Sequence, residues 1–366
     1  MVTMKKCGER ILFYSGKKLI VYNEDNIKTV DLPAPILKIQ KQEENNKTKE
    51  DVDAIISCLS VSKDHKYIAV STETKQVVIY NEYFEIIKNF TVPRIASNMC
   101  FTSNDSLIVA DKTGDVFLYN MKDEILTPVL LLGHLSIVLD VALTDCGKYI
   151  ITSDRDEKIR VSKFPNSYNI QSFCLGHEEF VLSVIIVQNK LISASGDGTV
   201  RFWDYLDGKQ LSVINTNDYI NEELVKNFKE EMGLQDAEVF ALPITDMQCF
   251  SRENDIFIGI SLFKYNKLLL FSLNPSLRIN FCKHIYVGGS FSFYLSKDLL
   301  ILTSTKILFF KLEGKNYRED AHKNISIDDV HDLRLKSDNN ISLLYKKKFD
   351  NMEEYIERKR ARLKLK

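Results

Sequence analysis

The sequence lacks the long hydrophobic runs of a membrane protein. Its longest apolar stretches, such as residues 299–302, have the length of a β-strand and not of a membrane-spanning helix. Residues 1–10 lack the apolar core of a secretory signal. These absences predict a soluble intracellular protein with no membrane partner.

An excess of one charge is also missing. Lys and Arg number 49 and Asp and Glu 50, so any contact with nucleic acid must be local. The seven cysteines stand singly, without the paired spacing of a zinc site, which predicts free thiols in a reducing compartment. The few histidines are dispersed, and we predict no metal site.

Catalytic motifs are absent as well. No Gly-x-Ser-x-Gly, His-Glu-x-x-His or Cys-x-x-Cys occurs. The glycine-bearing strings at residues 196–198 and 287–290 do not match a dinucleotide- or S-adenosylmethionine-binding loop, which needs a strand, a glycine-rich turn and a helix. We therefore predict no catalytic residues and no cofactor on this chain.

What the chain does contain is a repeat. Gly133-His134 and Gly176-His177 lie about 43 residues apart, which is the period of a WD-type propeller blade. A bulky residue closes the third strand of such a blade, as Trp203 does here. Counting outward from Trp203, comparable strands end at Tyr22, Tyr80, Tyr119, Ser162, Phe271 and Phe310. The sequence therefore predicts an all-β fold, a seven-bladed WD-type β-propeller.

The propeller is predicted to span residues 1–345, with two surface insertions. The first, at about 40–53, is polar and is predicted to be a mobile loop. The second, at 217–243, is predicted to contain a helix on the propeller's flank, with a partner-docking helix as the alternative. Its apolar residues stand at helical spacing before Gly233: Leu224, Val225, Phe228 and Met232.

Closure of the ring requires every blade to be complete, because an open end would leave an edge strand unpaired. Residues 10–22 provide only two obvious strands. We predict that residues 341–345 supply the missing strand, so that the two ends of the chain lock the ring.

Each Gly-His pair predicts a buried polar network, in which imidazole, turn aspartate, strand hydroxyl and indole satisfy one another. The predicted members are His134, Ser153 and Asp156 in the first copy, and His177, Ser195 (or Ser193), Asp197 and Trp203 in the second. Ser162 replaces the tryptophan of the first copy, so that network is predicted to be incomplete. Both histidines are interpreted as structural.

Residues 154–160, Asp-Arg-Asp-Glu-Lys-Ile-Arg, form what we call the charged turn. One interpretation is a solvated turn whose ion pairs contribute about 0–1 kcal/mol each. The other is a docking site, because charges fixed on a rigid β-scaffold suit recognition of a charged partner. The residues alone leave both open.

Residues 346–366 form a basic tail, predicted to be helical. Phe349, Met352, Ile356 and Leu363 are spaced for one helix face, and lysines and arginines crowd the rest.

These motifs resemble one family. The strings at residues 111–116, 133–142, 153–162 and 173–181 are similar to the WD-repeat non-catalytic subunit of the eukaryotic tRNA (guanine-N7-)-methyltransferase, the Wuho-like family. The resemblance is dense over residues 109–203 and returns at 342–351. Residues 1–100 and 205–335 support only the propeller.

The resemblance implies an accessory subunit that binds, stabilises and positions a separate catalytic subunit as a heterodimer. That partner would carry S-adenosylmethionine and form N7-methylguanosine in the variable loop of tRNA. The resemblance implies that the charged turn faces the partner. The implied contacts are Lys112, from the equivalent turn one blade earlier, and Asp156, Glu157 and Arg160.

The basic tail would add contacts to tRNA phosphates. Its candidate residues are Lys346, Lys347, Lys348, Arg358, Lys359, Arg360, Arg362 and Lys364. A solvated helix or a nuclear import signal is the alternative. The expected location is the nucleus, with the cytoplasm as a second compartment.

Two other functions stay open. The chain could be a general WD-repeat scaffold or a ubiquitin-ligase substrate receptor, but Trp203-Asp204 is not followed by the arginine of the Trp-Asp-x-Arg element. A propeller enzyme would need carboxylates or histidines converging on the central channel, which one sequence cannot place.

Overall fold

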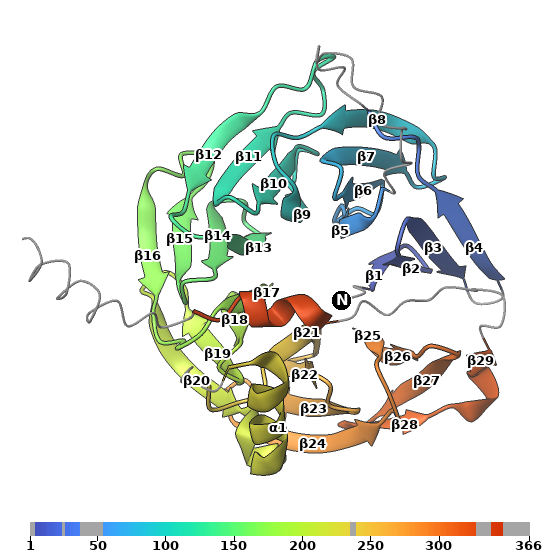
Figure 1. Cartoon of the computed structure of the whole chain (residues 1–366), viewed down its shortest axis with the longest axis vertical. Helices are drawn as coiled ribbons and strands as arrows, with labels where there is room; N and C mark the ends of the chain where they lie inside the picture. The colour runs from blue at the N-terminus through green and yellow to red at the C-terminus, as the bar shows by residue number, and fades with distance from the viewer. Residues whose placement is uncertain (1–3, 24–25, 37–53, 235–238, 327–337, 347–366) are drawn as a thin grey trace, which may run out of the picture.

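The structure, a computed structural model, describes residues 4–23, 26–36, 54–234, 239–326 and 338–346. Seven antiparallel sheets stand radially around a central axis, and the chain passes once around the ring (Figure 1). Within the described residues, no helix is long and apolar enough to span a membrane. The predicted seven-bladed propeller is confirmed.

Each blade is one contiguous segment of chain with its first strand innermost. The first three blades are β1 (Lys5–Cys7), β2 (Arg10–Ser15), β3 (Lys18–Asn23), β4 (Asn26–Asp31); β5 (Ile56–Val61), β6 (Tyr67–Thr72), β7 (Gln76–Asn81), β8 (Ile86–Thr91); and β9 (Ala96–Phe101), β10 (Leu107–Asp111), β11 (Asp115–Tyr119), β12 (Val129–Gly133). The next two are β13 (Val138–Leu143), β14 (Tyr149–Asp154), β15 (Ile159–Lys163), β16 (Ile170–Cys174); and β17 (Val181–Val187), β18 (Lys190–Ser195), β19 (Thr199–Asp204), β20 (Lys209–Asn215). The last two are β21 (Ile244–Arg252), β22 (Asp255–Leu262), β23 (Lys267–Leu273), β24 (Ile279–Tyr286); and β25 (Ser292–Leu295), β26 (Asp298–Leu302), β27 (Lys306–Glu313), β28 (Asn316–Glu319), with β29 (Ile325–Ser326) also paired to β27.

The middle strands of each blade are apolar almost throughout because neighbouring blades cover both of their faces. In β7, for example, the side chains from Gln76 to Tyr80 are all buried, whereas the outermost strand β8 is largely exposed. The seven residues predicted to close third strands all lie on third strands: Tyr22, Tyr80, Tyr119, Ser162, Trp203, Phe271 and Phe310.

The predicted closure by residues 341–345 is wrong. Blade 1 takes its innermost strand from β1, which needs only three residues because Gly8 turns the chain directly into β2. Blade 1 therefore has no vacancy for a C-terminal strand. The ring closes by packing of side chains between blades 7 and 1, including Phe13, Leu302 and Ile307.

Residues 338–343 instead form a 3-10 helix, η3 (Asp338–Leu343), which lies close to the central axis in Figure 1. Just after it, Tyr345 is buried against Phe180 and Phe228, and its hydroxyl donates to the Gly196 carbonyl (3.1 Å). The C-terminal segment therefore caps blades 5 and 6 rather than joining a sheet.

The second insertion contains the predicted helix, α1 (Glu222–Met232), preceded by the short 3-10 helix η1 (Thr216–Tyr219). The Asn221 side chain caps α1 at its start, and Gly233, with φ of 62°, ends it. A second short 3-10 helix, η2 (Ala321–Lys323), interrupts the outer edge of blade 7. The first insertion lies outside the described residues.

The repeated topology sorts the turns onto two rims. Because every blade is a four-stranded meander, the turns between second and third strands share one rim, here called the upper rim, with the connections between blades. The turns between first and second strands, and between third and fourth strands, share the lower rim. The charged turn, Lys112 and the capping segment at Tyr345 all lie on the upper rim.

Asp140, on the innermost strand β13, joins three blades. Its carboxylate accepts hydrogen bonds from Asn98 Nδ2 in blade 3 (2.5 Å), from its neighbour Val141 N–H (2.8 Å), and from Val184 N–H in blade 5 (2.7 Å). Burial raises the pKa of Asp140 to about 6, although the hydrogen bonds from the Val184 and Val141 N–H groups oppose the shift.

Replacing Asp140 by Ala should lower the free energy of unfolding by about 1–3 kcal/mol, because the buried Val184 N–H loses its acceptor. Urea unfolding at neutral pH measures this. Asp140→Asn, which keeps one acceptor oxygen, should lose less, and equal losses in the two variants would contradict the hydrogen-bond account.

The natural protein and Asp140→Asn should also differ in how their free energies of unfolding depend on pH. A carboxyl whose folded pKa exceeds its unfolded value contributes stability at low pH that is lost as the pH rises through about 6. Asp140→Asn should therefore become more stable relative to the natural protein between about pH 5 and about pH 8.

Candidate docking site on the upper rim

The polar network of blade 5 is complete. His177 Nδ1 donates to Asp197 Oδ2 (2.9 Å), and Ser193 Oγ donates to His177 Nε2 (2.7 Å) while accepting from Trp203 Nε1 (2.8 Å). Burial alone would raise the pKa of Asp197, but the hydrogen bonds from His177, Thr199 and the Glu178 N–H, together with the charge of His177, outweigh it and lower that pKa to about 2. Ser195 is not a member: its hydroxyl donates to the Glu179 carbonyl (3.0 Å) and stabilises the turn.

Blade 4 builds its network from other residues than those predicted. His134 Nδ1 bonds Asp154 Oδ2 (3.0 Å), and His134 Nε2 bonds Thr152 Oγ1 (2.8 Å). The strand hydroxyl is Thr152 and not Ser153, because adjacent strand residues point to opposite faces of the sheet. Thr152 pairs with Arg160 as Ser193 pairs with Arg201, so the two hydroxyls hold equivalent positions.

The acid of this network is Asp154, at the end of β14, and not Asp156 in the turn. Burial would raise the pKa of Asp154, but bonds from His134 and from the Lys158 N–H (3.0 Å) hold that pKa below its usual value. Asp156 is therefore released from the structural role that its counterpart Asp197 has in blade 5. Its side chain lies on the upper rim and is 30% exposed.

The Asp156 and Glu157 carboxylates lie beside the C-terminal segment. Lys346 Nζ lies 2.6 Å from Glu157 Oε1 and 4.0 Å from Asp156 Oδ1, and Arg155 Nε lies 3.6 Å from the same Asp156 oxygen. The structure thus brings two residues predicted to bind the partner together with one predicted to bind RNA. We call Asp156, Glu157 and Lys346 the ionic corner.

Arg160 is turned inward. Its guanidinium donates to Ser162 Oγ (2.9 Å), to the Ser167 carbonyl (2.9 Å) and to the Gly133 carbonyl (3.3 Å). Burial lowers its pKa. Arg160 thus bonds the serine that replaces the tryptophan, the connection between β15 and β16 in blade 4, and the end of β12 in blade 3, so its first role here is structural.

Exposed apolar side chains flank the ionic corner on the blade connections of the same rim. Leu135, next to His134, is fully exposed, and Leu175 is 62% exposed. Lys112 is exposed in the β10–β11 turn, one blade away. A surface of mixed charges with apolar anchors beside them has the composition expected of a protein–protein interface.

Glu179 adds a charge that varies near neutral pH. Burial raises the pKa of its carboxyl to about 7, and repulsion by Glu157 adds to the shift while Lys346 opposes it. Loss of its proton adds a negative charge next to the ionic corner.

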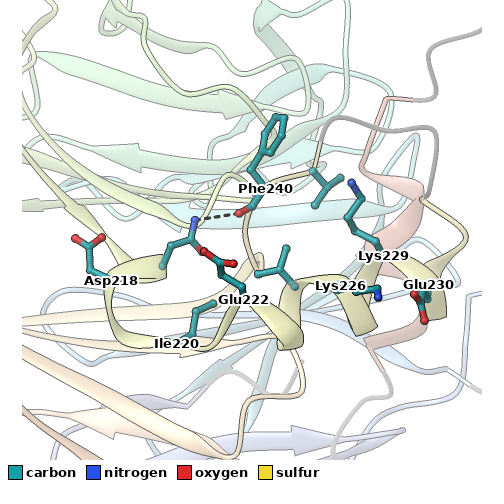
Figure 2. A pocket seen from close by; sticks show the side chains of 10 residues that line it. Asp218, Ile220, Glu222, Lys226, Lys229, Glu230 and Phe240 are labelled. Atoms are coloured by element: carbon teal, nitrogen blue, oxygen red, sulfur yellow. Dashed lines mark hydrogen bonds between the residues drawn. The ribbon is translucent and has the colours of Figure 1, made fainter.

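The remaining features of the described residues are their potential metal ligands and their hollows. The described residues contain no group of three or more metal-ligating side chains. A hollow of about 720 Å³ beside α1 is lined by side chains of both charges, including Glu222, Lys226 and Lys229 (Figure 2). At its edge, Asn217 Nδ2 donates a hydrogen bond to the Phe240 carbonyl (3.0 Å).

The predicted RNA-binding residues Lys347, Lys348, Arg358, Lys359, Arg360, Arg362 and Lys364 lie outside the described residues.

Comparisons with known proteins bear on this surface. The sequence profile described as the tRNA methyltransferase TRM82 WD40 domain matches residues 15–129 and 120–292. A Drosophila grimshawi protein named tRNA (guanine-N(7)-)-methyltransferase non-catalytic subunit wuho is 36% identical over 58% of this chain and 61% of its own length. The Danio rerio protein named tRNA (guanine-N(7)-)-methyltransferase non-catalytic subunit wdr4 is 30% identical over 87% of this chain and 79% of its own length.

A solved structure agrees in fold alone. One chain in the crystal structure of the mitotic checkpoint complex matches with a TM-score of 0.64 at 14% identity, covering 82% of this chain and 86% of that one. The family profile, by contrast, extends over most of the propeller, including the charged turn. This chain belongs to the WD-repeat family of tRNA (guanine-N7-)-methyltransferase non-catalytic subunits.

Proposed function

We propose that this protein binds the catalytic subunit of a tRNA (guanine-N7-)-methyltransferase as a heterodimer through the ionic corner, and stabilises and positions it. The observation that carries the proposal is that Asp154, and not Asp156, binds His134, which leaves the Asp156 and Glu157 carboxylates of the turn beside Lys346 on the upper rim. S-adenosylmethionine would belong to the partner, and the product would be N7-methylguanosine in the variable loop of tRNA. The nucleus is the proposed location.

The mechanism is thermodynamic. A rigid partner that binds only the competent conformation of the catalytic subunit raises the population of that conformation by mass action. The propeller suits this role because Asp140 ties blades 3, 4 and 5 together directly beneath the rim that carries Lys112 and the charged turn. Leu135 and Leu175 would supply apolar contact area around the ion pairs.

The C-terminal segment would connect partner docking to tRNA. Tyr345 is anchored on blade 5, and Lys346 lies in the ionic corner, so the basic tail begins beside the proposed docking surface. From that point, its lysines and arginines would contribute phosphate contacts to tRNA held by the catalytic subunit.

Charge reversal at Glu157 of the ionic corner, and at Lys112 one blade away on the same rim, tests the docking role. Glu157→Lys and Lys112→Glu should each weaken binding of the catalytic subunit about tenfold or more, because opposite charges across the interface become like charges. Co-purification and titration of the two subunits measure this. Lys209→Glu, an exposed lysine on the lower rim, is the matched control, and unchanged binding by both the Glu157 and the Lys112 variant would refute the proposal.

Replacing Arg160 should destabilise the isolated protein, because this side chain bonds other parts of the propeller. Arg160→Ala should lower the free energy of unfolding by about 1–3 kcal/mol, because the guanidinium's three internal hydrogen bonds are lost. Urea unfolding of the isolated protein measures this. A variant that unfolds like the natural protein yet fails to bind the catalytic subunit would instead place Arg160 directly in the interface.

Removing residues 358–366 tests the tail. The truncated protein, in complex with the catalytic subunit, should bind tRNA more weakly and with a shallower salt dependence, since each lost phosphate contact reduces the slope by about 0.9 for duplex regions. Binding of the catalytic subunit itself should be unchanged. An unaltered salt slope would remove the tail from tRNA binding.

A further inference from the structure

The seam between blades 7 and 1 encloses a cavity of about 1260 Å³ on the lower rim. Its walls come from the first three strands of blade 1, from the end of β21 and from blade 7. The upper part of the same seam is filled by the cluster around Phe13, Leu302 and Ile307. The cavity therefore lies on the side of the ring opposite to the ionic corner.

Aromatic rings form the inner walls of this seam cavity. Phe250, Tyr294 and Phe309 are half-buried, so part of each ring remains accessible from the cavity. Tyr22 of blade 1 and Phe309 of blade 7 meet across the seam with ring centroids 5.9 Å apart. Flat apolar faces thus line the recess from both blades.

Unpaired cations surround the mouth. Lys297, Lys311 and Lys323 line the cavity and are exposed, and no carboxylate of the described residues lies within 4.0 Å of their amino groups. Lys6 and Arg252 are engaged, since Lys6 lies 3.8 Å from Glu9 and Arg252 lies 3.8 Å from Glu253. Glu9, Asp298 and Asp320 also line the cavity, so lysines and arginines outnumber carboxylates there by five to three. Three lysines are therefore free to meet an anion.

The geometry points to a binding site for an unpaired stretch of RNA in the seam cavity. Bases would stack on the half-buried rings, and phosphates would meet the lysines at the mouth. An acidic peptide fits less well, because carboxylates that entered the recess would leave water for apolar walls. The volume exceeds that of ordinary small-molecule sites, about 300–1,000 Å³, so it has room for more than one nucleotide.

This site rests on the proposed function in one respect, the choice of RNA over single-stranded DNA. It does not depend on the ionic corner, which occupies the other rim. RNA in the seam cavity would leave the docking surface free, so the isolated full-length protein is the right material for a test.

Fluorescence anisotropy with a single-stranded RNA of about eight nucleotides measures the affinity. Lys297→Glu combined with Lys311→Glu should weaken binding at least about tenfold and reduce the salt slope by about 1.4, the value for two phosphate contacts on a single strand. Lys122→Glu combined with Lys209→Glu, two exposed lysines elsewhere on the lower rim, should change neither quantity.

Stacking is tested at Tyr294. Tyr294→Leu should weaken binding about 5- to 150-fold, as loss of one base–ring stack does, while Tyr294→Phe keeps the ring and should bind like the natural protein. Thermal melting of both variants separates lost stacking from lost folding. Equal losses in the two variants would mean that the ring does not stack on a base.

Photo-crosslinking with 4-thiouridine in the same RNA locates the contact. Crosslinks to peptides containing Tyr294 or Phe309 support the site, whereas crosslinks confined to residues 346–366 assign the RNA to the tail and overturn it. Tighter binding of single-stranded DNA, or of a glutamate-rich peptide sensitive to the same lysine substitutions, would also overturn it. A negative result for the RNA site would not contradict the proposed roles in subunit docking and tRNA methylation, because those roles are measured with the catalytic subunit present.

Discussion

The hydrogen bond between His134 and Asp154 determines which charges on the upper rim are available for recognition. In blade 5 the equivalent histidine binds the turn aspartate, and the turn is structurally committed. In blade 4 the acid has moved back to the strand end, and the network is satisfied without the turn. The same arrangement of strands thus has its turn aspartate, Asp197, inside the network of blade 5 and its turn aspartate, Asp156, outside the network of blade 4.

The C-terminal segment adds a second layer to this arrangement. Tyr345 is held by Phe180, Phe228 and the Gly196 carbonyl, which brings Lys346 against Glu157. A lysine from the far end of the chain therefore balances the acidic side of the turn when no partner is present. In the proposed complex, the catalytic subunit would share or replace that contact, so the free and bound states of the corner would differ by an exchange of ion pairs and not by the creation of new charges.

Much of the propeller could be predicted because its signals are local. The spacing of the Gly-His pairs and the apolar third strands are set within single blades, and all seven predicted third strands were found.

The closure of the ring was not predictable in the same way, because three residues with little apolar character, Lys5 to Cys7, suffice for an innermost strand when a turn follows at once. The acid of blade 4 was missed because the turn offers two aspartates two residues apart, and only the direction of the side chains distinguishes them. The Lys346 contact joins positions 189 residues apart, and no local pattern encodes it.

The self-contained first blade has a consequence for how the molecule is made. All four of its strands come from residues 5–31, so its hydrogen-bonded ladders can be completed before most of the chain has been synthesised. Blade 7, made last, then meets a finished surface, and no strand has to be threaded into an existing sheet. The junction between blades 7 and 1 therefore consists of side-chain packing without strand exchange, and its lower part is left open as the seam cavity.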